Sequence, residues 1–171
     1  MPFHPASSLA RLIETPVRPG VVVWIGARPA RREAMRAEPV ALLAAGRGLV
    51  GDRYANAGGA RQLTLIEAES LATIASHLGR ERVDGEDVRR NVVVRGINLL
   101  ALKGRRFRIG AALLEASGEC HPCSRMEEIL GAGGYNAMRG LGGITARVID
   151  GAPIRVLTAE CREISYQTVT F

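Results

Sequence analysis

Several residue types that mark particular protein classes are scarce in this sequence. Three of its 171 residues are cysteine, an odd and sparse count that argues against a disulfide scaffold. Aromatic residues make up 4% of the chain, so aliphatic side chains must build most of the core. No apolar run reaches the ~18 residues of a membrane span, and the N-terminal stretch MPFHPASSLARLIETP lacks the apolar segment of a secretory signal. We therefore expect a cytoplasmic protein with reduced thiols and no membrane partner.

Lysine is also nearly absent, because Lys103 is the only lysine among 23 basic residues. Set against 17 Asp and Glu, these residues give a net charge of +6 that arginine carries almost alone. Arginine presents a planar fork that matches phosphate and carboxylate oxygens, which suggests an anionic ligand. A solvated, arginine-rich surface explains any single arginine equally well.

The length is about that of one domain, and we expect a single domain over residues 1–171. Short segments rich in β-branched or aliphatic residues lie between turn residues, and each predicts a strand. These segments are 20–27, 38–45, 61–67, 90–96, 105–110, 112–118, 143–150 and 152–158. Strands and helices do not alternate, so we expect a mostly β (α+β) fold, a closed or partly closed β-barrel.

One longer helix is predicted over residues 67–79. Leu71, Ile74, Ala75 and Leu78 recur at helical spacing and would form one apolar face. Gly79 is a plausible end for this helix. We expect one or two shorter helices elsewhere.

Residues 118–128, GECHPCSRMEE, contain two of the three cysteines, Cys120 and Cys123. Ser124 and Glu127 have the spacing of a capping box, which predicts a short helix with Ser124 as its N-cap. Cys123 would then lie near the positive end of the helix dipole, with an arginine two residues further on. Both features favour the thiolate, the form that binds a metal or attacks an electrophile.

The C-x-x-C spacing leaves other interpretations open. A zinc site needs about four nitrogen or sulfur ligands, and the other candidates form no second close pair; they are His4, His77, His121 and Cys161. A thioredoxin-like redox pair needs a βαβ context that the sequence does not show. Cys120 is explained as well by a small core or loop residue as by a functional one.

Two further motifs carry polar groups that bind anions. GLVGDRY places Asp52 and Arg53 after a glycine turn, and VRRNVVVRG places Arg89, Arg90 and Asn91 at the start of a strand. Each motif alone is common, since aspartate and arginine often occupy turns. Their joint presence in one small β protein is more specific.

In order along the chain, these motifs resemble the MOSC domain, which is named for the C-terminal part of molybdenum-cofactor sulfurase. The resemblance runs from about residue 20 to about residue 158 and rests on GLVGDRY, RQLTLIEAE, RRNVVVRGINLLALKGRRFRIGAALLE, CHPCSRMEE and GGYNAMRGLGGITARVIDGAPIRV. It implies a β-barrel-like fold, in agreement with the predicted strands.

The resemblance also implies a site for the molybdenum cofactor, a pterin dithiolene that bears a phosphate. The family's cysteine, which ligates molybdenum or carries sulfur, falls on Cys123, which is therefore the candidate metal ligand and catalytic residue. The family's arginine-x-asparagine falls on Arg89 and Asn91. Arginine forks suit the cofactor phosphate. The expected cofactor-binding residues are Asp52, Arg53, Arg89, Arg90, Asn91, Ser124 and Arg139.

Arg139 belongs to a glycine-rich stretch, residues 131–143, in which six of thirteen residues are glycine. A long surface loop explains this composition. A loop that closes over the site beside Cys123 explains it equally well, because glycine lets the backbone approach a flat pterin.

Two functions follow from the resemblance. An enzyme would reduce N-hydroxylated small-molecule substrates at a cysteine-ligated molybdenum, as an oxidoreductase fed by a partner reductase. A non-catalytic carrier would instead hold the cofactor, or hold sulfur as a persulfide on Cys123 that a sulfurase partner supplies. A nucleic-acid-binding barrel is not expected, because the aromatic platform is missing and Trp24 stands alone. The sequence leaves the oligomeric state open.

Overall fold

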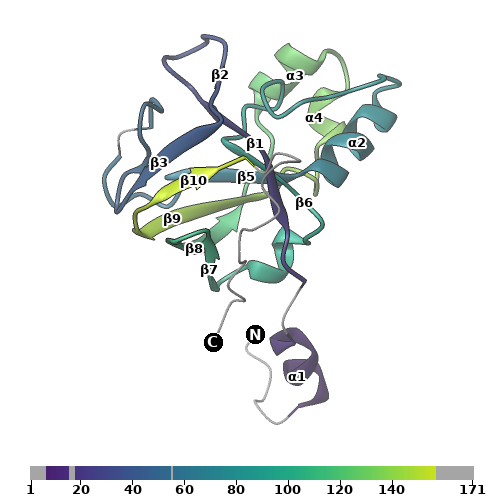
Figure 1. Cartoon of the computed structure of the whole chain (residues 1–171). Coiled ribbons are helices and arrows are strands. Elements are labelled where there is room, and N and C mark those ends of the chain that lie inside the picture. Colours follow the sequence, from purple (N-terminus) through teal and green to yellow (C-terminus); the bar gives the residue numbers. More distant parts are fainter. Residues whose placement is uncertain (1–6, 16–17, 55, 157–171) are drawn as a thin grey trace.

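The structure is a computed structural model that describes residues 7–15, 18–54 and 56–156 (Figure 1). Its helices are α1 (Ser8–Glu14), α2 (Ala68–His77), α3 (Ser124–Leu130), α4 (Gly134–Ala137) and the 3-10 helix η1 (Leu99–Leu102). Its strands are β1 (Val21–Ala27), β2 (Arg36–Ala37), β3 (Val40–Ala44), β4 (Gly48–Leu49), β5 (Leu63–Glu67), β6 (Val92–Arg95), β7 (Arg106–Ile109), β8 (Ala112–Glu119), β9 (Ile144–Asp150) and β10 (Pro153–Arg155). Each strand predicted from the sequence is present, although residues 157 and 158 of the last one lie outside the described residues.

Two sheets enclose the main core. A seven-stranded sheet has the order β2-β1-β6-β5-β9-β8-β7, and a three-stranded sheet has the order β10-β3-β4. Both contribute side chains to one apolar cluster, for example Leu43 and Ile154 from the smaller sheet and Leu65 and Leu114 from the larger. The Gly46 amide, just after β3, also donates to the carbonyl of β9 residue 148 at 2.9 Å. This partly closed barrel with a few helices confirms the expected mostly β (α+β) fold.

A second core lies between the sheet and the helices α2, α3 and α4, which lie together in Figure 1. Ile66 of β5 and Val93 of β6 face these helices, where they meet Ile74 and Met126. Strands β5 and β6 run parallel, which requires a crossover, and α2 lies in that crossover. Strand β5 is therefore covered on both faces.

The polar residues that alternate along the β5 segment are buried, unlike those of a half-exposed strand. Gln62 and Thr64 are 1% and 2% exposed. Their polar groups find partners inside, because the Gln62 side-chain carbonyl accepts from the Val148 amide at 2.9 Å and Thr64 pairs with Asn91. Buried polar groups need such partners, since desolvation without a hydrogen bond is costly.

Helix α2 follows its sequence pattern. Leu71, Ile74 and Ala75 are buried in the second core. The helix ends at His77, and Gly79 has a φ of +62°, the left-handed conformation that glycine adopts most readily after a helix.

The glycine-rich segment 131–143 is not the long loop expected from its composition. It contains α4, and its Ala137 and Met138 are buried. A Cβ atom on Gly142 would lie 2.0 Å from the Cys120 carbonyl oxygen, closer than any real contact. Glycine is therefore required there because two backbone segments pack against each other, and the segment is a packed turn and helix.

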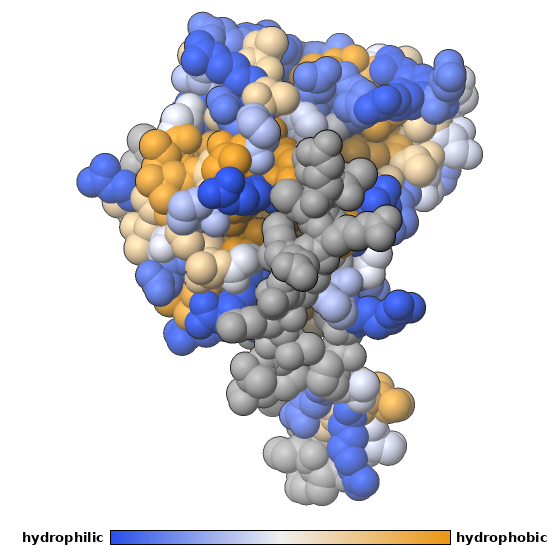
Figure 2. Space-filling view, in the orientation of Figure 1, coloured by the Kyte–Doolittle hydropathy of each residue, from blue (hydrophilic) through white to orange (hydrophobic). Residues whose placement is uncertain are grey.

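The outer surface is uneven in polarity. Figure 2 shows apolar residues gathered over the region of β3 and β9, where Val40, Leu42 and Ile149 are exposed. The upper part of the same view, over β2 and the helices, is mostly hydrophilic. Among the described residues, no helix has the length and apolar character that crossing a membrane requires.

Candidate functional site

A buried carboxylate, Asp52, connects three separate segments of the chain. Its side chain is 1% exposed. Its Oδ1 accepts from the Arg28 backbone amide at 2.7 Å and from Arg28 Nε at 2.9 Å, and its Oδ2 accepts from Arg28 Nη2 at 2.7 Å. The Tyr54 amide and Asn91 Nδ2 donate to it at 3.1 and 3.0 Å. This bidentate pair fixes the direction of the Arg28 guanidinium.

Asn91, the residue immediately before β6, completes this network. It is fully buried, and its Nδ2 also donates to the Gly26 carbonyl at 3.1 Å. Its Oδ1 accepts from the Thr64 hydroxyl at 2.9 Å and from the Thr64 amide at 3.2 Å. Asn91 thus links β1, β5 and β6 and holds Asp52 in place.

The pKa of Asp52 reflects this environment. Burial would raise the pKa of the carboxyl, but the hydrogen bonds and charge of Arg28, together with the Tyr54 amide, lower it below its usual value. The carboxylate is therefore ionised at neutral pH and matches one guanidinium charge.

Arg89 lies within electrostatic range of Arg28, Arg53 and Arg125, and we call these four residues the arginine cluster. Burial lowers the pKa of Arg89, and repulsion by Arg28, Arg125 and Arg53 lowers it further, with Asp52 acting in the opposite direction. Mutual repulsion of this kind requires that the groups share one region.

The backbone of Arg89 is held in an unfavourable conformation. Its φ is +55°, in the left-handed region that costs a non-glycine residue about 1–2 kcal/mol. Its Nη1 donates to the Glu33 carbonyl at 2.8 Å, which ties it to the loop between β1 and β2. Strain of this kind persists where the surrounding structure fixes the residue.

Cys123 is exposed, and it precedes helix α3 directly. The helix begins at Ser124, so Cys123 occupies the N-cap position, and its side chain makes no capping hydrogen bond. The predicted capping box is therefore wrong. Glu127 instead accepts from the Gly133 and Tyr135 amides, each at 2.8 Å, and these amides lower its pKa. The competing amides of the next turn draw this side chain away from the start of the helix.

Cys120 differs from Cys123 because it is buried, with 1% of its surface exposed. Its Sγ accepts a hydrogen bond from Arg61 Nη2 at 3.5 Å. Its carbonyl accepts from Arg90 Nη2 at 3.0 Å, and Arg90 Nε donates to the Gly142 carbonyl at 2.9 Å. Burial lowers the pKa of Arg90, while negative charge on either cysteine would raise it. Arg90 therefore fixes the segment that carries Cys123 by its hydrogen bond to the Cys120 carbonyl.

Comparison with known proteins identifies the family. A family model described as the MOSC domain matches residues 52–159. The chain belongs to the MOSC domain family. Comparison with curated protein sequences gives no match.

Solved structures share the MOSC fold. The YuaD protein of Bacillus subtilis superposes with a TM-score of 0.69 at 19% identity, over 81% of this chain and 92% of that one. YiiM from Geobacillus stearothermophilus gives a TM-score of 0.66 at 16% identity, over 88% of this chain and 80% of that one. YiiM from Escherichia coli gives 0.61 at 19% identity, over 79% and 65%. At these identities the likeness concerns the fold.

The structure places the predicted site residues of this MOSC chain in different settings. Arg53 lies in the arginine cluster and is exposed, while Arg90 is buried and bonded to three carbonyl groups. Ser124 and Arg139 are exposed at the start of α3 and after α4. Asp52 and Asn91 lie under the cluster, bonded to protein groups.

Sequence reasoning missed Arg28 and Arg61. Arg28 follows β1 directly, and a charged residue at the end of a buried strand is a usable signal. Its partner Asp52 is 24 residues away, however, and only the tertiary fold joins them. Arg61 carries no local signal, because its sulfur contact spans 59 residues.

Proposed function

We propose that this MOSC chain binds the molybdenum cofactor at the arginine cluster, with Cys123 Sγ as a ligand of the metal, and that it reduces N-hydroxylated compounds. One observation supports the proposal: an exposed thiol stands at the start of α3, and Arg125, two residues further on, lies within electrostatic range of Arg89 together with Arg28 and Arg53. A negative charge on Cys123 would act on Arg90, which supports a thiol site close to the buried side of this region.

The donor set fits the cofactor. Arginine forks suit a phosphate, and a thiolate is a soft ligand that suits a metal already bound by dithiolene sulfurs. No group of three or more His, Cys, Asp or Glu side chains within the described ranges could hold a metal ion. One protein thiol is the ligand contribution expected when the cofactor brings the remaining sulfurs.

Each group of the chain has a distinct task in this proposal. Cys123 must lose its proton to ligate a metal, so metal loading releases a proton. Arg53 and Arg89 bind the phosphate, and Asp52 and Asn91 are positioning residues that orient Arg28. Arg90 holds the segment before Cys123 through the Cys120 carbonyl.

The bound cofactor supplies the two-electron chemistry that accepts oxygen from an N–O bond. Reduction of an N-hydroxylated compound breaks that bond, consumes two electrons and two protons, and leaves an N–H group and water. The electrons come from a partner reductase. The chain contributes the positions of the thiolate and of the cations around the anionic cofactor, and such preorganised charges stabilise bound anions without rearrangement.

Metal analysis tests the proposal. The protein, produced with molybdate in a host that makes the cofactor, should contain about one molybdenum per chain and a pterin that fluoresces after acid oxidation. Cys123→Ala should lose the metal, and Cys120→Ala should retain it. Arg53→Gln should lower the cofactor content, whereas Arg106→Gln should not, because Arg106 is 63% exposed on β7 and lies beside Glu115.

Reduction of an N-hydroxyamidine with a dithionite-reduced dye as electron donor completes the test. Activity that follows the molybdenum content across these variants supports the enzyme. A metal-free protein that carries a cyanide-labile sulfur on Cys123 would overturn the proposal and identify a sulfur carrier.

A further inference from the structure

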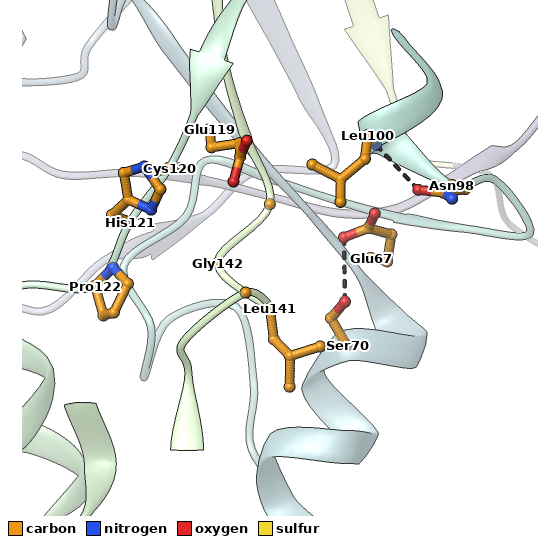
Figure 3. A pocket seen from close by; sticks show the side chains of 12 residues that line it. Glu67, Ser70, Asn98, Leu100, Glu119, Cys120, His121, Pro122, Leu141 and Gly142 are labelled. Carbon is orange, nitrogen blue, oxygen red and sulfur yellow. Dashed lines mark hydrogen bonds between the residues drawn. The ribbon is translucent and has the colours of Figure 1, made fainter. Parts of the chain in front are cut away.

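Two adjoining cavities lie near the end of β5, and the smaller also borders the segment that precedes Cys123. The smaller, about 170 Å³, is lined by Glu67, Ser70, Asn98, Leu100, Glu119, Cys120, His121, Pro122, Gly140, Leu141, Gly142 and Gly143 (Figure 3). The larger, about 390 Å³, is lined by Glu67, Glu69, Ser70, Gly96, Ile97 and Asn98. They share Glu67, Ser70 and Asn98, so they form one continuous groove, which we call the acidic groove.

The lining of the acidic groove contrasts with the rest of the molecule. The chain carries 23 Lys and Arg against 17 Asp and Glu. Neither cavity is lined by an arginine or a lysine, whereas three glutamates line the groove: Glu67, Glu69 and Glu119. A depression lined by three glutamates and by no arginine or lysine, with His121 as its one basic side chain, favours ligands that donate hydrogen bonds or carry positive charge.

Glu67 lies where the two cavities meet, at the end of β5. It is 9% exposed, and its oxygens each accept one hydrogen bond, from the Leu99 amide at 2.9 Å and from the Ser70 hydroxyl at 3.2 Å. A carboxylate offers about four acceptor positions, so about two remain for a ligand. Figure 3 shows Glu67 and Ser70 on one side of the smaller cavity and His121 and Pro122 on the other, with Leu141 between them.

Other groups of the protein donate hydrogen bonds to both carboxylates that line the smaller cavity, Glu67 and Glu119. A hydrogen bond from Lys103 Nζ at 2.7 Å lowers the pKa of Glu119, and the charges of Lys103 and His121 act in the same direction. Lys103 thus neutralises part of the charge on this wall. Among the described residues, no cationic side chain hydrogen-bonds to Glu67, and its side chain lines both cavities.

We propose that the acidic groove binds the amidinium or guanidinium group of a small ligand, with Glu67 as its carboxylate partner. Such groups are planar and present two parallel N–H donors, which match the two oxygens of a carboxylate. The smaller cavity has the volume of about six water molecules at ~30 Å³ each, enough for the head of a ligand whose remainder extends into the larger cavity.

This inference rests on the proposed function for its biological meaning. Reduction of an N-hydroxyamidine replaces N–OH by N–H and yields an amidine, which is protonated at neutral pH. The groove borders residues 120–122, immediately before the proposed metal ligand. It would then hold the protonated amidine product beside the site and discriminate against carboxylate-bearing compounds.

Binding to cofactor-free protein tests the groove separately from catalysis. The probes are benzamidine, its neutral counterpart benzamide and its anionic counterpart benzoate, titrated at pH 7 by calorimetry. Benzamidine should bind about tenfold or more tightly than benzamide, which is the size expected of one charge-assisted bidentate contact. Benzoate should not bind in the groove.

Three variants sharpen the measurement. Glu67→Gln keeps an oxygen for the Leu99 amide but removes the charge, so it should abolish the preference for benzamidine. Lys103→Met removes the competing cation beside Glu119 and should strengthen benzamidine binding several-fold. Glu81→Gln, at an exposed glutamate outside both cavities, should leave binding unchanged.

Equal binding of benzamidine and benzamide, or equal losses in Glu67→Gln and Glu81→Gln, would overturn the inference. If the groove fails in this way while the metal-loaded protein still reduces an N-hydroxyamidine, the proposed function stands alone. If benzamidine binds as expected to a chain that never acquires molybdenum, the groove stands as a cation site and the proposed function fails.

Discussion

Replacing Asp52 by Asn tests whether the buried network holds the site together. The substitution keeps the shape of the side chain but removes its charge and turns one acceptor into a donor. Asp52 receives five hydrogen bonds, three of them from Arg28. An amide NH2 group in that position would face donors that it cannot satisfy, and the Arg28 guanidinium would lose its counter-charge.

The magnitude follows from burial. Removing one partner of a buried ion pair costs about 3–5 kcal/mol. Arg28 is 15% exposed, so water compensates part of the loss, and we expect about 2–4 kcal/mol. For a chain of this size, each kcal/mol lowers Tm by about 2–4 °C, so Tm should fall by roughly 5–15 °C.

Thermal and urea unfolding of Asp52→Asn measure this cost, with Glu81→Gln as an exposed carboxylate control that should change stability by less than about 0.5 kcal/mol. The double variant with Arg28→Gln should lose less than the sum of the single losses, because the two residues form one unit. A loss below about 1 kcal/mol for Asp52→Asn, or additive losses, would show that the network does not organise this region.

The same pair gives the protein a defined response to acid. The pKa of Asp52 is lowered in the folded chain, so the unfolded chain binds more protons between the two pKa values, and stability rises with pH there. The stabilisation is complete above the unfolded pKa of about 4 and is lost as the pH falls through the lower folded pKa. The difference between the native chain and Asp52→Asn should therefore be constant near pH 7 and shrink below about pH 4.

Two further substitutions separate backbone effects from binding. Arg89→Gly should leave stability within about 1 kcal/mol, because relief of the left-handed strain offsets the lost side-chain contact, yet lower the cofactor content; Arg32→Gly, at φ +67°, is the matched control and should leave the cofactor content unchanged. Gly142→Ala should cost about 1–3 kcal/mol in unfolding free energy, since its Cβ would meet a backbone oxygen at 2.0 Å, whereas Gly118→Ala, with 3.7 Å of space, should be nearly neutral. Tm values that rank these pairs in the opposite order would contradict the packing argument.

The strands and the longest helix could be predicted because their causes are local. The segment VVVWIGA of β1 is β-branched and bounded by turn residues, and the apolar spacing of α2 produces its buried face. The capping signature at Ser124 and Glu127 failed for a tertiary reason, since amides of a later turn compete for the same carboxylate. A local pattern states which partners are possible, and the fold decides which partner is near.

The candidate site, like the fold, could be predicted from the sequence only in its local features. Family motifs brought Arg53, Arg89 and Cys123 to attention, but they did not reveal that Asn91 is fully buried. Its amide bridges β1, β5 and Asp52, and those contacts span 65, 27 and 39 residues. Pairings at such separations have no signature in a single sequence. Sequence motifs alone therefore do not distinguish a residue that positions other side chains from one that binds a ligand.

The two cysteines differ in burial and therefore in the roles that they can have. Cys120 is fixed between Arg61 and the backbone of the glycine-rich segment, and Arg90 ties its carbonyl to Gly142. Cys123, three residues later, is exposed and free of capping bonds. A pair that acted together in redox chemistry would need both sulfurs accessible to one reagent, because exchange proceeds by attack of a thiolate on an accessible sulfur. The structure instead exposes one thiol and uses the other to fasten the segment that also borders the acidic groove. This short segment therefore connects the proposed cofactor site with the proposed site for a cationic ligand.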